Sequence, residues 1–80
     1  MRIYECILER IETLCKQRGI TINQLSYLSG VSSSTIKSMY YGKSRNPGVV
    51  TIKKLCDGLD ISITEFFNTE AFRSLEQEIK

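Results

Sequence analysis

The strongest constraint on the fold is a close series of helix start and stop signals in the first half of the chain. The stretch Thr21–Gln24 has the pattern of a capping box, in which the first and last side chains satisfy each other's backbone amides. Gly30 can leave a helix with a positive φ, and Ser32 is a favourable N-cap. The pattern predicts two short helices joined by a tight turn, the first stopping at Gly30 and the second spanning residues 33 to about 41.

Apolar residues at helical spacing predict further helices on both sides of this pair. The stripe before it, which ends near Gly19, consists of Ile3, Ile7, Ile11, Leu14 and Cys15. The stripe after it consists of Val49, Ile52, Leu55, Cys56 and Leu59. Ser62–Glu65 is a second capping-box pattern and opens a helix through Phe67. Since no stretch alternates like a strand, we expect an all-α domain of five helices in residues 1–67 and a short C-terminal helical tail in residues 68–80.

The length of 80 residues is enough for one domain with a small core. No apolar run is longer than that of Met39–Tyr41, which is far too short to span a membrane. The N-terminus lacks the charged, apolar and small-residue pattern of a signal peptide. We therefore expect a cytoplasmic protein with no membrane association.

Histidine is absent, and the three cysteines have no CxxC or Cys/His spacing. The favoured interpretation of Cys6, Cys15 and Cys56 is that they are reduced thiols of the core, and a zinc site or a disulfide framework is the alternative. Without histidine, a paired-acid arrangement or a base beside Cys15, no active site is visible. We expect no enzyme activity, no metal or other cofactor and no small-molecule substrate.

Charge is distributed unevenly along the chain, although the net charge is only +2. Residues 14–55 hold seven basic side chains and no acidic one, whereas residues 57–80 hold six acidic and two basic side chains. One part of the surface is therefore suited to a polyanion and the other is not. The alternative is an ordinary solvated surface of mixed charge.

The predicted helix 33–41 combines an apolar side with a polar edge of small residues. With Ile36 and Met39 turned inward, the residues on the other side are Ser33, Ser34, Lys37 and Ser38. Small hydroxyl side chains allow a helix end to approach base edges closely, while lysine reaches guanine acceptors or phosphates. Helix capping and simple solvent exposure are the alternative explanation for the serines.

The loop that follows this helix contains two cations, a hydroxyl and an amide within four residues. These residues are Lys43, Ser44, Arg45 and Asn46, and groups of this kind bind phosphate oxygens and fix register on DNA. An ordinary polar loop is the alternative. The phenol of Tyr41 either joins these backbone contacts or packs against the domain.

The stretch TINQLSYLSGVSSSTIKSMYYGKSRNPGVVTIKKLCDGLDIS, residues 21–62, resembles the DNA-binding domain of the phage-repressor and Cro (XRE) helix-turn-helix regulators. The resemblance rests on the small residue Ser26, on residues 30–32 and 34–36, on Gly42-Lys43 and on the stretch 51–62. It implies a compact five-helix, lambda-repressor-like domain with its third helix in the major groove of double-stranded DNA, and a homodimer on two half-sites.

The resemblance also implies the roles of single residues. Base contacts fall to Ser33, Ser34 and Ser38, with Lys37 beside them, and phosphate contacts fall to residues 43–46. Two positions depart from the family pattern. Ile22 stands where many members have a phosphate-binding glutamine, which leaves Asn23 as the substitute contact. Tyr40 and Cys15 stand where some relatives have an acid and an arginine, so we expect packing in place of an ion pair.

The C-terminal tail leaves two possibilities open. Its apolar stripe of Phe72, Leu75 and Ile79 either folds back on its own domain or meets a second copy as a dimerisation element. We expect a sequence-specific transcriptional regulator, in the first place a repressor. The alternative is a protein-interaction module of antitoxin or anti-repressor type, in which DNA binding is secondary or lost.

Overall fold

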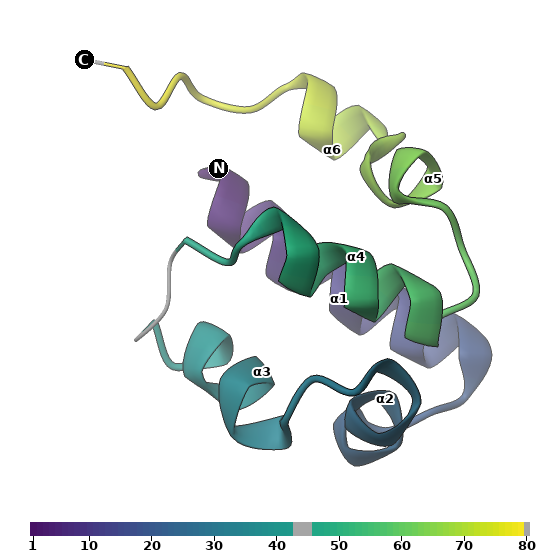
Figure 1. The fold of residues 1–80 in the computed structure, drawn as a ribbon. Coiled ribbons are helices and arrows are strands. Elements are labelled where there is room, and N and C mark those ends of the chain that lie inside the picture. The colour runs from purple at the N-terminus through teal and green to yellow at the C-terminus, as the bar shows by residue number, and fades with distance from the viewer. Residues whose placement is uncertain (43–45, 80) are drawn as a thin grey trace.

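The structure, a computed structural model, describes residues 1–42 and 46–79. This part of the chain forms six α-helices (Figure 1): α1 (Ile3–Arg18), α2 (Ile22–Ser29), α3 (Ser33–Tyr40), α4 (Val49–Gly58), α5 (Ile63–Phe67) and α6 (Glu70–Arg73). The described residues contain no strand, so the predicted all-α fold is confirmed. None of these helices is both long and apolar enough to cross a bilayer.

The helices enclose a single core to which each of the first five contributes a fully buried side chain. These side chains are Ile11, Leu25, Ile36, Leu55 and Phe66. Met39 is buried, as predicted for the inward side of α3, and Val31 in the turn before α3 is buried as well. Val49 differs from the prediction, because it begins α4 outside the core and is 68% exposed.

The predicted signals around α2 and α3 are present in the structure. The Gln24 amide donates to Thr21 Oγ1 at 3.1 Å, and the Thr21 amide donates to Gln24 Oε1 at 2.7 Å, which completes the capping box. Gly30 ends α2 with φ 74°, a conformation that glycine adopts without strain. Ser32 then accepts the Thr35 amide at 3.2 Å and caps α3. The two short helices are therefore fixed by local hydrogen bonds on either side of a tight turn.

The contact between α2 and α4 depends on a glycine that the sequence patterns did not single out. A Cβ atom at Gly58 would lie 2.9 Å from both the Cβ and the backbone nitrogen of Ser29. Such a distance is too short for any side chain, so α4 and α2 approach this closely only because position 58 has none. Gly58 thus fixes α2, and with it the turn to α3, against α4.

The C-terminal tail is less helical than predicted. Thr69 caps α6 by accepting the Phe72 amide at 3.4 Å, but α6 ends at Arg73. Four residues are too few to support a helix on their own, and the stripe breaks up. Phe72 packs against the core, whereas Ile79 is 81% exposed. The prediction of a helical stripe through Ile79 was therefore wrong.

The tail nevertheless lies against its own domain. The Phe67 and Phe72 rings meet edge to face with centroids 4.9 Å apart. The Glu76 amide donates to the Met1 carbonyl at 3.3 Å, and Arg2 pairs with Glu78 at 3.0 Å. Folding back on the same chain, one of the two possibilities left open by the sequence, is thus what the structure shows for the tail.

The three cysteines are core side chains. Cys6, Cys15 and Cys56 are buried and unpaired with one another, which confirms their interpretation as thiols of the core. Burial raises the pKa of each thiol, because it disfavours the charged thiolate. In residues 1–42 and 46–79 there is no group of three or more side chains suited to hold a metal ion.

Candidate nucleic-acid interface

The polar edge of α3 faces solvent, and its apolar side is buried. Ile36 and Met39 are 0% and 2% exposed, whereas Ser34 and Lys37 are exposed and Ser38 is half-buried. Ser33 is half-buried as well. The helix therefore presents a shallow edge whose two outermost predicted side chains are a small hydroxyl and a lysine.

The hydroxyl groups of this edge are arranged by bonds within α3. Ser38 donates its hydroxyl to the Ser34 carbonyl at 2.8 Å, which leaves its own oxygen free to accept. Ser32, the N-cap, lies 2.8 Å from the hydroxyl of Thr35 and 3.3 Å from that of Ser34. Capping therefore explains Ser32 but does not use up the hydrogen-bonding capacity of Ser34 and Ser38.

Thr35 is an exposed side chain of the first turn of α3 that the predicted set of contacts leaves out. Its backbone amide and its hydroxyl both bond to Ser32. The sequence signal for it was its position three residues after the cap, where a hydroxyl side chain can bond back to the cap. Thr35 thus adds a hydroxyl at the end of the helix where the macrodipole is positive.

The other predicted contacts are distributed unevenly around this edge. Tyr41 directly follows α3, is 75% exposed and lines the same hollow as Lys37. Asn23 is exposed, but it lines a different hollow, together with Tyr27 and Leu28 of α2. Tyr41 and Lys37 thus line one hollow, and Asn23 lines another.

The predicted phosphate-binding loop is described only at its end. Asn46 is exposed just before α4. Lys43, Ser44 and Arg45 lie outside the described residues, so their predicted contacts remain predictions.

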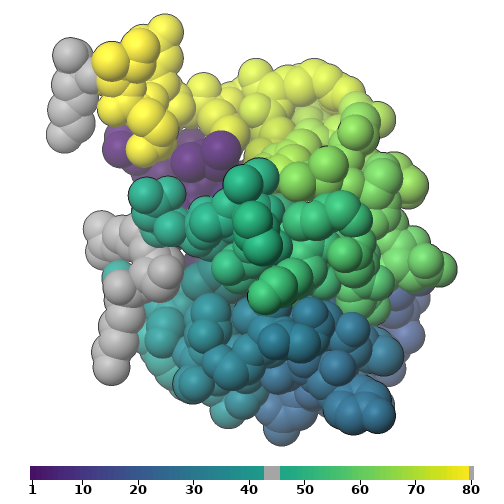
Figure 2. All heavy atoms as spheres, in the orientation of Figure 1, coloured from purple at the N-terminus to yellow at the C-terminus, as the bar shows by residue number. Residues whose placement is uncertain are grey.

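The charged side chains of the described residues are segregated in space. The α2–α3 end of the molecule lies opposite the end formed by α5, α6 and the tail, with α4 between them (Figures 1 and 2). The tail end holds four exposed acids, Glu65, Glu70, Glu76 and Glu78, and the last three pair with Arg73, the N-terminus and Arg2 in that order. On α3 the one charged residue is Lys37. In α4, Lys53 pairs with Asp57 and so has its charge partly offset, while Lys54 is exposed. Acidic side chains thus gather at the tail end, whereas α2 and α3 carry one cation and no acid.

Tyr40 reaches from the end of α3 toward α1, where Cys15 is buried. The hydroxyl oxygen of Tyr40 is closed off from solvent and has no hydrogen-bond partner among the described residues. Burial, with smaller contributions from Glu12 and Cys15, raises the pKa of Tyr40 to about 12. The expected packing of Tyr40 near Cys15 is therefore present, but it leaves one polar atom unsatisfied.

Three comparisons with known proteins agree with one another. Residues 10–71 match the family model of the Cro/C1-type HTH DNA-binding domain. The HTH-type transcriptional regulator SlrR of Bacillus subtilis (strain 168) is 40% identical over 55 residues, which cover 69% of this chain and 36% of that protein. The HTH-type transcriptional repressor RghR of the same organism is 42% identical over 53 residues, which cover 66% of this chain and 39% of that protein. The chain thus spans less than two fifths of the length of these curated relatives.

A solved structure extends the likeness to nearly the whole chain. The prophage Lp1 protein 11 superposes with a TM-score of 0.81 at 33% identity, over 94% of this chain and 100% of that one. The matching region includes α2 and α3 with the turn between them.

Proposed function

Because the chain belongs to the Cro/C1-type HTH DNA-binding family, we propose that it binds double-stranded DNA in a sequence-specific way and represses transcription, with α3 inserted in the major groove. The observation that carries this proposal is the exposed edge of α3 opposite the buried Ile36 and Met39. A major groove about 12 Å wide admits a helix whose leading side chains are small. The name of RghR as a repressor supports the direction of regulation.

Base contacts in this proposal come from Ser33, Ser34, Lys37 and Ser38. A serine hydroxyl both donates and accepts, so it can pair with either kind of base edge, and the Lys37 ammonium favours the acceptors of guanine. Because Ser38 already donates to the Ser34 carbonyl, it would act as an acceptor, for example from an amino group of adenine or cytosine.

Phosphate contacts in this proposal hold α3 in register. They fall to Tyr41 at the end of α3 and to the loop residues Lys43, Ser44, Arg45 and Asn46. Asn23, at the start of α2, is the remaining candidate. Such contacts contribute affinity for any sequence, and the bases then select among sequences.

Two copies would act together on one operator. A single eight-residue recognition helix reads only a few base pairs, and regulators of this architecture bind half-sites one helical turn apart, about 34 Å. We therefore propose a homodimer, which meets its DNA in the cytoplasm.

Selection of binding sites from random DNA at two salt concentrations tests this function. We expect an enriched sequence with two symmetric half-sites. With roughly six phosphates neutralised per dimer, the logarithm of the binding constant should fall with a slope of about −5 against the logarithm of salt concentration. A flat salt dependence, or no enriched sequence, would refute the proposal.

A further inference from the structure

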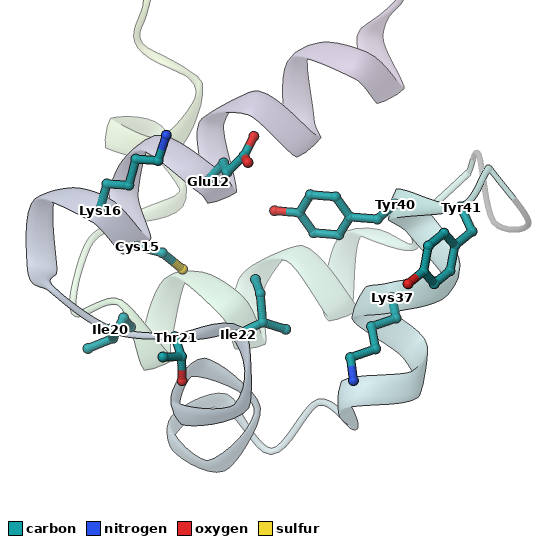
Figure 3. Close-up of a pocket in the computed structure, with 9 residues that line it drawn as sticks. All are labelled: Glu12, Cys15, Lys16, Ile20, Thr21, Ile22, Lys37, Tyr40 and Tyr41. Carbon is teal, nitrogen blue, oxygen red and sulfur yellow. The ribbon is translucent and has the colours of Figure 1, made fainter.

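A hollow of about 440 Å³ lies between α1, the turn into α2, and the end of α3. Figure 3 shows the side chains around it: Cys15 of α1 and Ile22 of α2 on one side, and the rings of Tyr40 and Tyr41 on the other. Its volume falls in the range of small-molecule sites, which are concave and mostly apolar with a few polar groups. The hollow therefore has the size and the lining expected for a small apolar ligand.

The polar groups around this hollow define the ligand's charge. Lys37 forms no ion pair in the part of the chain that the structure describes, and its side chain lies on the same side of the hollow as Tyr41 (Figure 3). Lys16 and Glu12, one cation and one anion, lie on the α1 side. The excess charge around the hollow is thus positive and is carried by Lys37, which suits a ligand with one negative group.

The orientation of the ligand follows from Tyr40. Its hydroxyl oxygen points toward α1 (Figure 3) and is closed off from solvent, so a ligand that enters the hollow meets the ring of Tyr40. The rings of Tyr40 and Tyr41 line the hollow together with the half-buried Ile22, and this lining favours a flat apolar body. The acid group of such a ligand then points away from Tyr40, toward the Lys37 ammonium.

We propose that this hollow binds a small aromatic carboxylate, with its ring between Ile22 and Tyr40 and its carboxylate paired with Lys37. The consequence for DNA rests on the function proposed above. Because Lys37 and Tyr41 are also proposed DNA contacts, an occupied hollow withdraws them from DNA. The ligand acts as an inducer that loosens the protein from its operator.

Binding is tested on the protein alone by isothermal calorimetry with 2-naphthoate and its neutral analogue 2-naphthalenemethanol. We expect 2-naphthoate to bind with a Kd of about 1 mM or tighter, as is usual for a ligand of this size. The alcohol should bind about threefold more weakly, because it lacks the pairing with an exposed lysine. In an NMR titration the amides of Ile22 and Tyr40 should shift most.

Two variants locate the carboxylate. Lys37→Gln keeps an exposed position of α3 polar and should weaken 2-naphthoate to the affinity of the alcohol. Lys54→Gln removes the same charge from an exposed position of α4 that does not line the hollow, and should leave both affinities unchanged. The site is refuted if 2-naphthoate fails to bind at ten times the expected Kd, or if Lys37→Gln binds it as well as the unaltered chain does.

The consequence for DNA is tested separately by fluorescence anisotropy with the selected operator. 2-Naphthoate should raise the apparent Kd for DNA, while the alcohol at equal concentration should change it less. If 2-naphthoate binds but leaves the affinity for DNA unaltered, the inducer step is wrong. If the chain binds no DNA at all, the proposed function fails, and the calorimetry still decides whether the hollow is a ligand site.

Discussion

The end of the molecule formed by α5, α6 and the tail differs from the end formed by α2 and α3 in how its charged side chains are used. At the α5 end, Arg10 donates to the Phe66 carbonyl at 2.8 Å and to the Glu65 carbonyl at 2.9 Å. Arg73 bonds to Asn68 and to Glu70. At the other end, Lys37 has no such partner among the described residues. We call the end formed by α5, α6 and the tail the closed end, because its charged groups bond within the chain. The end formed by α2 and α3 is the open end, because it leaves polar groups for an external partner.

This difference shows how a chain of 80 residues combines a stable core with a surface that can contact a partner. The three phenylalanines cluster at the α5 end, where Phe66 is fully buried and its ring meets that of Phe67 edge to face at 4.9 Å. The α2–α3 end is instead fixed by caps and by the close approach of Gly58 to Ser29. Substitutions of buried side chains at the first end should therefore change stability, and substitutions on the exposed edge of the second should change binding.

The largest expected effect is at the closed end. Phe66→Ala removes a fully buried ring and should lower the free energy of unfolding by about 3–5 kcal/mol, measured by urea denaturation. Ile79→Ala, at an 81% exposed position of the tail, is the control and should change it by less than about 0.5 kcal/mol. A comparable loss from both variants would mean that the core does not lie where the structure has it.

The second effect concerns the bonds between α1 and α5. Arg10→Ala removes the guanidinium that caps the last carbonyls of α5 and should cost about 1.5 kcal/mol of stability. Arg18→Ala, at an exposed arginine of the same helix, should cost about 0.5 kcal/mol or less. Thermal unfolding of both variants measures the difference. Equal costs would show that the bonds from Arg10 to the end of α5 do not stabilise the fold.

The third expected effect concerns DNA binding. Arg45→Ala should weaken all DNA sequences alike, by about tenfold, and should reduce the salt slope of a dimer by about 2, because one phosphate contact per subunit is lost. Anisotropy titrations at several salt concentrations measure both quantities. A change in preference at a single base pair would instead mean that Arg45 reads a base.

The fourth expected effect is a difference in stability between Tyr40→Phe and Tyr27→Phe. Tyr40→Phe removes a hydroxyl that is buried without a partner among the described residues, and should raise the free energy of unfolding by about 1 kcal/mol. Tyr27→Phe removes the same group from an 87% exposed ring and should change nothing. A destabilised Tyr40→Phe would show that its hydroxyl has a partner in solution.

The gain in the free energy of unfolding from Tyr40→Phe should grow at high pH. The pKa of Tyr40 is about 12 in the folded chain against an ordinary value of 10.0. Between these two pH values the folded state therefore keeps the phenol proton that the unfolded state has lost. The contribution of Tyr40 to stability is therefore complete below pH 10 and declines as the pH rises toward 12. Urea denaturation of both chains at neutral and alkaline pH measures this trend.

The smallest effect is a change of base preference. Ser34→Ala removes one hydroxyl from the exposed edge of α3, and should alter discrimination at a single base pair by about 1 kcal/mol or less, without changing the salt slope. Repeating the site selection with this variant measures it. A uniform loss for all sequences would assign Ser34 to the phosphates.

The local signals of this sequence predicted more of the fold than its longer-range contacts did. The Thr21–Gln24 box and the positive φ at Gly30 depend on neighbours within a few residues, and both are found as expected. The role of Gly58 depends on Ser29, which is far away in the sequence, and no pattern near Gly58 reveals it. Asp60, with φ 57°, is a further position that local patterns did not indicate.

The same distinction between local and long-range contacts applies to the candidate site and to the contacts of α5. The outward direction of Ser34 and Lys37 follows from helical spacing once Ile36 is placed inside, so the sequence could predict it. The bonds of Arg10 to the end of α5 join residues more than fifty positions apart, and helical periodicity does not report them.

The second predicted capping box, Ser62–Glu65, is only half formed. Ser62 accepts the Glu65 amide at 3.0 Å, while the Glu65 side chain makes no return bond to Ser62.

Amide chemical-shift mapping with the selected operator tests the contrast between the two ends most directly. The shifts caused by DNA should concentrate on residues 33–38, on Tyr41 and on residues 43–46, while residues 63–79 stay unperturbed. The opposite distribution, with the largest shifts in α5, α6 and the tail and none along α3, would contradict the assignment of the open end to DNA.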